Sequence, residues 1–211
     1  MNRHDTYSLL LLAGGKSSRI VTDKAELLYE GKTFTELLTE KADSLGIQKK
    51  YLSGHKSTLS GIFAVPDVYP NRGPLGGIHA CMCAMNTPYC LVLPVDVPQL
   101  PSEVLEKLLR YHECLPEHEQ KLPLLLEHGE RVEPLIGIYP TKIKDAVENI
   151  IREDSAPVFR VLKKWGYRCF HMELPGWQAE NINTPEAYQE LLSHQEGVTS
   201  HAGENHPGKS S

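Results

Sequence analysis

The stretch that decides the fold reads Leu9-Leu10-Leu11-Leu12-Ala13-Gly14-Gly15-Lys16-Ser17-Ser18-Arg19-Ile20-Val21-Thr22-Asp23-Lys24. Its apolar run predicts a buried strand over residues 7–12, and the run stops at two glycines that allow close backbone approach. Free backbone N–H groups in such a turn bind anions, and Arg19 and Lys24 add positive charge. The stretch therefore predicts a strand that ends in a phosphate-binding loop.

Neither of the common phosphate loops matches this stretch. The Walker pattern fails because Leu10 stands where its first glycine belongs, and the Gly-x-Gly-x-x-Gly pattern of dinucleotide-binding folds is absent. Taken alone, the stretch is equally well explained as a strand followed by a charged, solvated turn. The remaining motifs of the chain decide between these interpretations.

Composition indicates one α/β domain in a chain of 211 residues, which we place at residues 1–192. Residues 193–211 are polar and rich in His, Gly and Ser, so we expect a disordered tail. A net charge of −5 gives no indication of a nucleic-acid partner. No signal peptide or membrane-spanning run is visible, and five cysteines without framework spacing fit a reducing compartment, so we expect a cytoplasmic protein without a membrane partner.

Strands and helices alternate through the first half of the chain, which favours right-handed βαβ units on a parallel sheet. Strands are predicted at residues 49–53, 63–65 and 89–95, and helices at 33–45, 74–85 and 102–111, with Thr33 and Glu36 forming a capping box and Ser102 an N-cap. The second half predicts a strand pair at 122–126 and 135–139, helices at 141–152 and 158–165, a strand at 167–172 and a last helix capped by Thr184. The expected sheet is mostly parallel with an antiparallel addition.

Several polar residues are candidates for chemistry, and each has a plain structural alternative. Asp96 follows an expected parallel strand and so points toward the crevice where open α/β sheets bind ligands, but it also suits a turn before Pro98. Asp67, Asn181 and Asn183 are explained equally well as turn or loop residues. His79, Cys81, Cys83 and Cys90 suggest zinc, but Cys81 and Cys83 lie about 200° apart on a helix, so core packing is the favoured interpretation.

Four motifs in a fixed order carry a family resemblance: LAGGKSSR followed by DKA, NRGPLGG, LPVDVP and NINTPEAY. Together they resemble the MobA family of molybdenum cofactor guanylyltransferases, over essentially the whole chain to about Leu192. The resemblance implies a Rossmann-like, three-layer αβα single domain. It also implies a nucleotidyltransferase that joins GMP from Mg-GTP to the terminal phosphate of molybdopterin and releases pyrophosphate.

The resemblance assigns roles to individual residues. Those that border the nucleotide or its phosphates are Leu12, Ala13, Gly14, Gly15, Ser17, Lys24, Asp67 and Asp96. The catalytic residues are Arg19, Lys24 and Asp96, with Arg19 and Lys24 clamping the triphosphate and Asp96 binding Mg²⁺. The molybdopterin-side residues are Asn181 and Asn183. The implied partners are GTP and molybdopterin, with cofactor-biosynthesis proteins and molybdoenzymes as further candidates.

Two positions depart from the family pattern. Val21 stands where the family usually has Gly, and Ser53-Gly54 stand where an Asn is common. Two other hypotheses therefore stay open: a related nucleotidyltransferase with another substrate, such as a CTP-dependent enzyme acting on a pterin or a sugar phosphate, and a non-catalytic carrier of a nucleotide or cofactor. The reaction itself needs no general base, because the attacking phosphate is already ionised.

Overall fold

The computed structural model describes residues 2–13, 27–54, 59–153 and 157–201, and within them seven strands form one sheet in the order β5-β4-β1-β6-β8-β7-β9. The strands are β1 (Tyr7–Leu12), β4 (Lys49–Ser53), β5 (Ile62–Val65), β6 (Tyr89–Pro94), β7 (Leu124–His128), β8 (Arg131–Pro140) and β9 (Arg168–His171). Strands β5, β4, β1 and β6 pair in parallel, whereas β8 is antiparallel to both β6 and β7. The predicted mostly parallel sheet with an antiparallel addition is confirmed.

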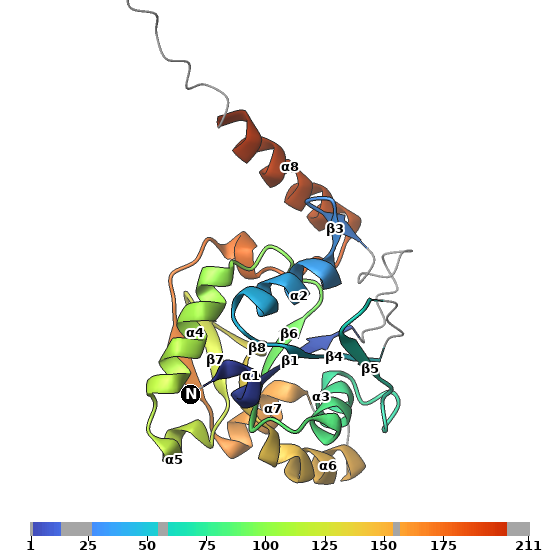
Figure 1. Ribbon diagram of the computed structural model, residues 1–211, viewed down its shortest axis with the longest axis vertical. Coiled ribbons are helices and arrows are strands. Elements are labelled where there is room, and N and C mark those ends of the chain that lie inside the picture. Colours follow the sequence, from blue (N-terminus) through green and yellow to red (C-terminus); the bar gives the residue numbers. More distant parts are fainter. Residues whose placement is uncertain (1, 14–26, 55–58, 154–156, 202–211) are drawn as a thin grey trace, which may run out of the picture.

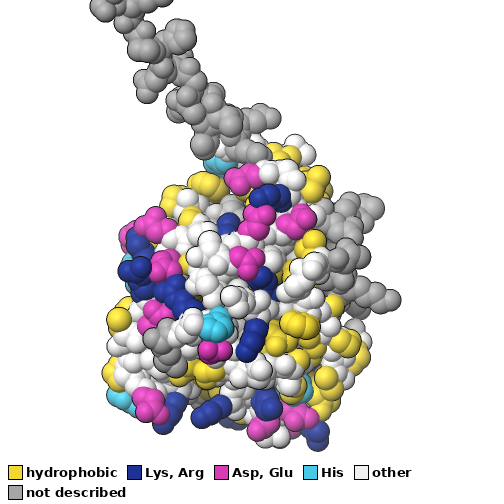
Figure 2. Space-filling view, viewed as in Figure 1, with side chains coloured by type: hydrophobic (Ala, Val, Ile, Leu, Met, Phe, Trp, Pro, Cys, Tyr) yellow, Lys and Arg dark blue, Asp and Glu magenta, His cyan; other side chains and the backbone are white. Residues whose placement is uncertain are grey.

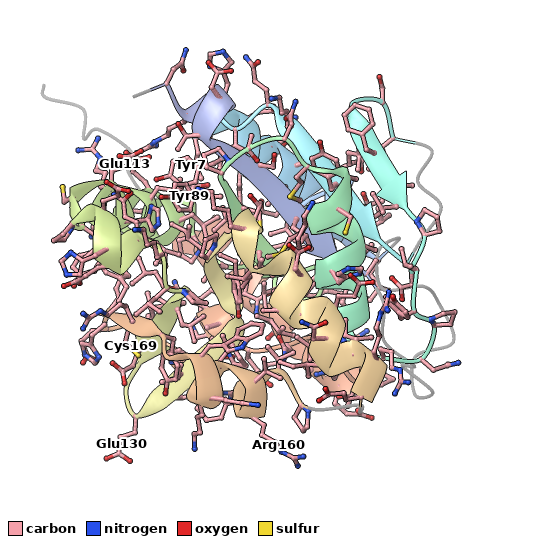
Figure 3. All side chains as sticks on the ribbon, turned by 90° about the horizontal axis from the view of Figure 1, so that it is seen from below. Tyr7, Tyr89, Glu113, Glu130, Arg160 and Cys169 are labelled. Atoms are coloured by element: carbon pink, nitrogen blue, oxygen red, sulfur yellow. The ribbon has the colours of Figure 1, made fainter. Side chains whose placement is uncertain are left out.

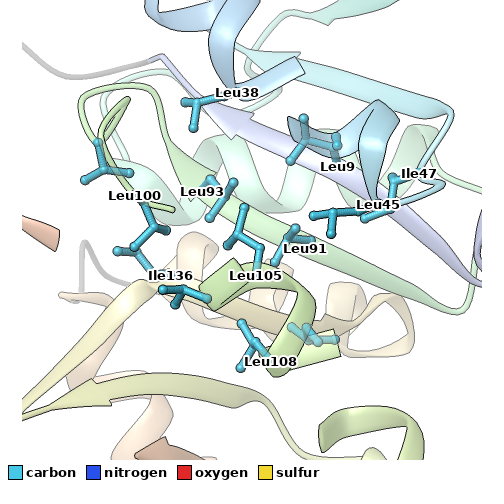
Figure 4. Close-up of a cluster of buried hydrophobic side chains, with 14 of the residues drawn as sticks. Leu9, Leu38, Leu45, Ile47, Leu91, Leu93, Leu100, Leu105, Leu108 and Ile136 are labelled. Atoms are coloured by element: carbon cyan, nitrogen blue, oxygen red, sulfur yellow. The ribbon is translucent and has the colours of Figure 1, made fainter. Parts of the chain in front are cut away.

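Helices cover both faces of the sheet, which confirms the three-layer αβα architecture (Figure 1). On one face, α2 (Phe34–Ser44) and α4 (Ser102–Cys114) pack Leu38 and Leu105 against Leu9 of β1 and Leu91 of β6 (Figure 4). On the other face lie α3 (Pro74–Ala84), α6 (Lys144–Glu153) and α7 (Val158–Trp165). Burial of both faces explains why β1 is a continuous apolar run instead of an alternating one.

Shorter elements complete the described chain. They are α1 (Arg3–Thr6), β2 (Leu28–Tyr29), β3 (Lys32–Thr33), α5 (Glu117–Gln120), the 3₁₀ turns η2 (Thr141–Ile143) and η3 (Gly176–Ala179), and α8 (Pro185–His201). The start of α8 packs Leu191 and Tyr188 against Phe34 of α2, and its far end projects from the body (Figure 1). The helix α8 continues past Leu192 to His201. The boundary between the domain and a disordered tail, expected at residue 192, stays a prediction.

Local sequence signals are correct at some helix starts and wrong at others. The capping box of Thr33 and Glu36 is present, and the backbone N–H of Ala187 donates to the Thr184 hydroxyl. The predicted N-cap at Ser102 is wrong: Pro101 occupies the cap position and no side chain caps the helix. The helix α1 was not expected, and it is tied to α4 by ion pairs from Arg3 that no local pattern reveals.

An aromatic cluster lies at the amino-terminal edge of the sheet, the edge where β1 and β6 begin. Tyr7 and Tyr89 begin the paired strands β1 and β6 (Figure 3). Their rings pack with each other and with the ring of His112 from α4. The Tyr7 hydroxyl lies 2.9 Å from His112 Nδ1, and burial lowers the pKa of His112 to about 4. These three rings therefore fill the space beside the first residues of β1 and β6.

Charged side chains of both signs share the surface, and the cysteines divide between the core and the surface. On the face seen in Figure 2, cationic and acidic side chains lie interspersed. No helix in the described ranges is long and apolar enough to cross a membrane. Cys81 and Cys90 are buried in the core, as expected, whereas Cys83 is exposed.

Candidate active site

The carboxyl ends of three neighbouring strands meet at one edge of the sheet. Leu12, the last residue of β1, pairs with Ser53 at the end of β4 and with Pro94 at the end of β6. The backbone N–H of Val95 donates to the Leu12 carbonyl over 3.1 Å, so β1 and β6 remain paired to their last residues. Ala13 follows as a half-buried residue that packs against the core. The chain therefore leaves β1 directly beside the start of the turn that carries Asp96, residues 96–100, which we call the Asp96 turn.

The predicted phosphate loop itself lies outside the described residues. This concerns the predicted site residues Gly14, Gly15, Ser17, Arg19 and Lys24. Leu12 and Ala13, the two predicted nucleotide-contacting residues that precede the loop, are described, and they fix the edge of the sheet from which the loop departs.

The start of α3 packs directly on the ends of β1 and β4. A Cβ atom at Gly77 would lie 2.6 Å from Ser53 Oγ, 2.8 Å from Ser53 Cβ and 3.3 Å from Leu12 Cδ2. The first two distances are too short for any Cβ, so only glycine permits this approach. The GPLGG motif thus places a helix N-terminus, with its partial positive charge and no acidic residue in its first turn, at the strand ends.

The same packing brings Asp67 to this edge. A Cβ atom at Gly76 would lie 3.1 Å from the Tyr69 carbonyl oxygen and 3.9 Å from Asp67 Oδ2. Asp67 and Tyr69 therefore lie against the first turn of α3. Within the described part of the chain, Asp67 Oδ1 is buried and has no hydrogen-bond partner, and burial raises the pKa of this carboxyl. A buried acceptor without a hydrogen bond lowers the stability of the folded protein, and a ligand that donates a hydrogen bond to it would remove this penalty.

Asp96 and the NINTPE motif are joined by the backbone. The N–H of Ile182 donates to the Asp96 carbonyl over 2.8 Å. Ile182 is buried, and its neighbours Asn181 and Asn183 are half-buried and exposed, respectively. Asp96 therefore lies beside the Asn181–Asn183 segment at the carboxyl end of β6, although the two are far apart in the sequence. This juxtaposition is what the sequence-based assignment of the three residues requires.

Gln99 is a residue of this region that the sequence motifs did not single out. It is 7% exposed, and its Nε2 donates to the carbonyls of Trp177 at 2.9 Å and Glu180 at 2.5 Å. It thus ties the Asp96 turn to the segment that leads into Asn181. No local pattern reveals this bond, because its two ends are about 80 residues apart in the chain.

Lys41 is a second residue of this region that the sequence motifs did not single out. From α2 its Nζ donates to the carbonyls of Pro98 and Leu100, the latter at 2.8 Å, and burial lowers the pKa of Lys41 to about 8. A sequence signal does exist for this residue: Lys41 lies four residues from both Leu37 and Leu45, on the apolar face of the predicted helix. A lysine on such a face is a candidate for a specific buried contact.

The donor set at this edge fits a hard divalent cation better than zinc. In the described ranges, no three His, Cys, Asp or Glu side chains are grouped as metal ligands. Mg²⁺ is commonly held by one or two carboxylates together with phosphate oxygens and water, so the single carboxylate of Asp96 at a strand end is sufficient. His79 Nε2 lies 3.4 Å from Cys83 Sγ within α3, and the core-packing interpretation of His79 and Cys81 is confirmed.

The fold is an α/β fold whose parallel strands β1, β4 and β6 end at one edge of the sheet, and open α/β sheets generally bind their ligands at this edge. The family model described as "MobA-like NTP transferase domain" matches residues 9–167, and the chain belongs to this family. It is therefore a nucleotidyltransferase.

Similar proteins agree with this family. The chain is 30% identical to a probable molybdenum cofactor guanylyltransferase of Clostridium perfringens, over 90% of this chain and 98% of that protein. It is also 30% identical to the molybdenum cofactor guanylyltransferase of Xanthomonas euvesicatoria pv. vesicatoria, over 87% of this chain and 93% of that one. The crystal structure of molybdopterin-guanine dinucleotide biosynthesis protein A from Archaeoglobus fulgidus has the same fold, with a TM-score of 0.70 at 21% identity over 90% of this chain and 99% of that one.

Proposed function

We propose that this protein transfers GMP from Mg-GTP to the terminal phosphate of molybdopterin, giving the guanine dinucleotide form of the cofactor and pyrophosphate. Membership of the MobA-like family and the names of the relatives at 30% identity support this substrate pair. The structural observation that carries the proposal is the convergence of Leu12, Asp67, Asp96 and the Asn181–Asn183 segment on one edge of the sheet.

On the nucleotide side, Leu12 and Ala13 border the guanine nucleotide, and the buried Oδ1 of Asp67 accepts a hydrogen bond from it. The triphosphate lies between the start of α3 and the loop after Ala13. In that loop Gly14, Gly15 and Ser17 offer donors, Arg19 makes bidentate contacts to phosphate oxygens and Lys24 supplies a point charge. These loop assignments depend on the family motif.

On the acceptor side, Asn181 and Asn183 face molybdopterin beside Asp96. An oxygen of the terminal phosphate attacks the α-phosphorus of GTP and forms a new P–O bond. The bond between the α-phosphorus and its bridging oxygen to the β-phosphate breaks, and pyrophosphate leaves with the electron pair. Because the attacking oxygen is already ionised, the side chains provide positioning and charge neutralisation instead of proton transfer.

The divalent ion of this class is assigned to Asp96, and we propose that it is Mg²⁺. Bound there, it would neutralise charge on the phosphates of the nucleotide. Asp96 is suited to hold it because its backbone is fixed both at the end of β6 and by the hydrogen bond from Ile182.

A nucleotide titration tests the proposal. We expect GTP with Mg²⁺ to raise the melting temperature, with a stabilisation of about 2.7 kcal/mol at a ligand concentration 100 times the Kd. CTP, ATP and UTP should give much smaller shifts. Stabilisation by CTP and not by GTP would favour the CTP-dependent hypothesis instead. Binding of GTP without any product from molybdopterin would favour a carrier.

A further inference from the structure

The turn that carries Asp96, residues 96–100, is attached to two other parts of the protein. On one side it is joined to the segment before α8, through Ile182 N–H to the Asp96 carbonyl and through Gln99. On the other side it is joined to α2 through Lys41. We propose that Lys41 and Gln99 are positioning residues, which hold Asp96 and the Asn181–Asn183 segment in the one arrangement that nucleotidyl transfer requires; this inference rests on the proposed function.

The contacts of Lys41 are specific to the turn. Its Nζ donates to Pro98 and Leu100, two backbone carbonyls within four residues of Asp96. Burial of an ammonium group is unfavourable unless it is hydrogen-bonded, so a lysine at this place is explained by what it binds. Packing of α2 on the sheet is already provided by apolar side chains of the same helix, such as Leu38 and Ala42.

Gln99 uses only the donor half of its amide. Both hydrogen bonds come from Nε2, while Oε1 is buried and has no partner among the residues that the structure describes. A buried unsatisfied acceptor costs free energy, so the presence of Gln99 at this place is explained by the two bonds that its Nε2 donates. The bonds to Trp177 and Glu180 fix the backbone immediately before Asn181.

The two residues act on the site from outside it. Neither lies on a strand end or in one of the four family motifs, and each reaches the backbone of the turn or of the segment before Asn181. A displacement of about 1 Å of catalytic groups can reduce a rate by about 100-fold, because reaction requires near-ideal geometry. Loss of either contact is therefore expected to affect the rate more strongly than nucleotide affinity.

The chain offers a matched control for each residue. Lys41→Met and Gln99→Met remove the donors and keep the length of the side chain. Lys50→Met removes another buried lysine contact, from Nζ to Asp43, near the start of β4. Gln120→Met removes an amide that also donates to two carbonyls, those of His112 and Leu115, in the cluster at the amino-terminal edge. Lys41→Arg keeps donors at position 41 and serves as the rescue variant.

Two measurements on the full-length protein test the inference. Steady-state kinetics with GTP and molybdopterin should show kcat lowered roughly 10-fold or more in Lys41→Met and Gln99→Met, with the KM for GTP changed less than about 3-fold. Binding of Mn²⁺, used as a spectroscopic probe by electron paramagnetic resonance in the presence of GTP, should weaken in both variants. Lys50→Met and Gln120→Met should match the wild type in both measurements, and Lys41→Arg should recover most of the rate.

The inference is overturned if the two variants and their controls lose activity equally in proportion to lost stability, or if Mn²⁺ binding is unchanged in Lys41→Met and Gln99→Met. A wild-type protein that makes no dinucleotide would contradict the proposed function. In that case the Mn²⁺ measurement still decides whether Lys41 and Gln99 position the Asp96 turn.

Discussion

Replacement of Gly77 by Ala tests whether the close packing of α3 on the strand ends shapes the site. The added Cβ would lie 2.6 Å from Ser53 Oγ and 2.8 Å from Ser53 Cβ, where ordinary contacts begin at 3.4 Å. Rotation of Ser53 relieves the first overlap, but the second requires a shift of the backbone of α3 or β4. Overpacking of this kind costs about 1–3 kcal/mol. The shift occurs where Leu12 and Ser53 end their strands, so affinity for GTP should fall as well.

Urea denaturation and a GTP titration measure both effects. A loss of about 2 kcal/mol with an m-value of about 2–3 kcal/mol/M lowers the midpoint by roughly 0.7–1 M. Gly176→Ala is the matched control, because a Cβ at Gly176 meets no atom within 4 Å. It should leave the midpoint and GTP affinity unchanged. A Gly77→Ala protein with wild-type stability and wild-type GTP affinity would refute the packing argument.

Two further predictions concern titratable groups. Asp67→Asn removes the charge of a half-buried carboxyl whose pKa is raised by burial, so the free energy of unfolding at neutral pH should not fall while GTP binds about 10-fold more weakly; unchanged GTP affinity would contradict the nucleotide role of Asp67. His112 has a pKa of about 4 when folded and about 6.5 when unfolded, so the unfolded chain binds more protons between these values. Stability should therefore fall by about 3 kcal/mol as the pH drops from 6.5 to 4, and His112→Phe should remove most of this slope in urea titrations; an equal slope in the variant would assign the effect to other groups.

Local patterns in the sequence predict the elements whose ends are set by nearby residues. The capping box at Thr33 and Glu36 places the start of α2 correctly, and the apolar run at 7–12 places β1. The four residues of α1 could not be predicted, because Arg3 is held by Glu106 and Glu113 from more than 100 residues away. The short β9 lies within the predicted range, but its pairing beside β7 depends on tertiary packing.

The site also combines residues that local patterns indicate with residues that only the fold brings in. The family resemblance predicts roles for Asp67, Asp96, Asn181 and Asn183, and these roles stay predictions. The structure brings Asp96 to the Asn181–Asn183 segment through the bond from Ile182. Motifs do not reveal Gln99, since its contacts join segments that meet only in the folded protein. The roles of the residues in the predicted phosphate loop stay predictions.

Formation of the product tests the central claim most directly. The purified protein would be incubated with molybdopterin, GTP and Mg²⁺, and the mixture analysed by mass spectrometry for the guanine dinucleotide and for pyrophosphate. The account predicts both products with the wild-type protein and neither with Asp96→Ala, which should remain folded and lose Mg²⁺-dependent GTP binding. Absence of the dinucleotide with the wild-type protein, or full activity of Asp96→Ala, would contradict it.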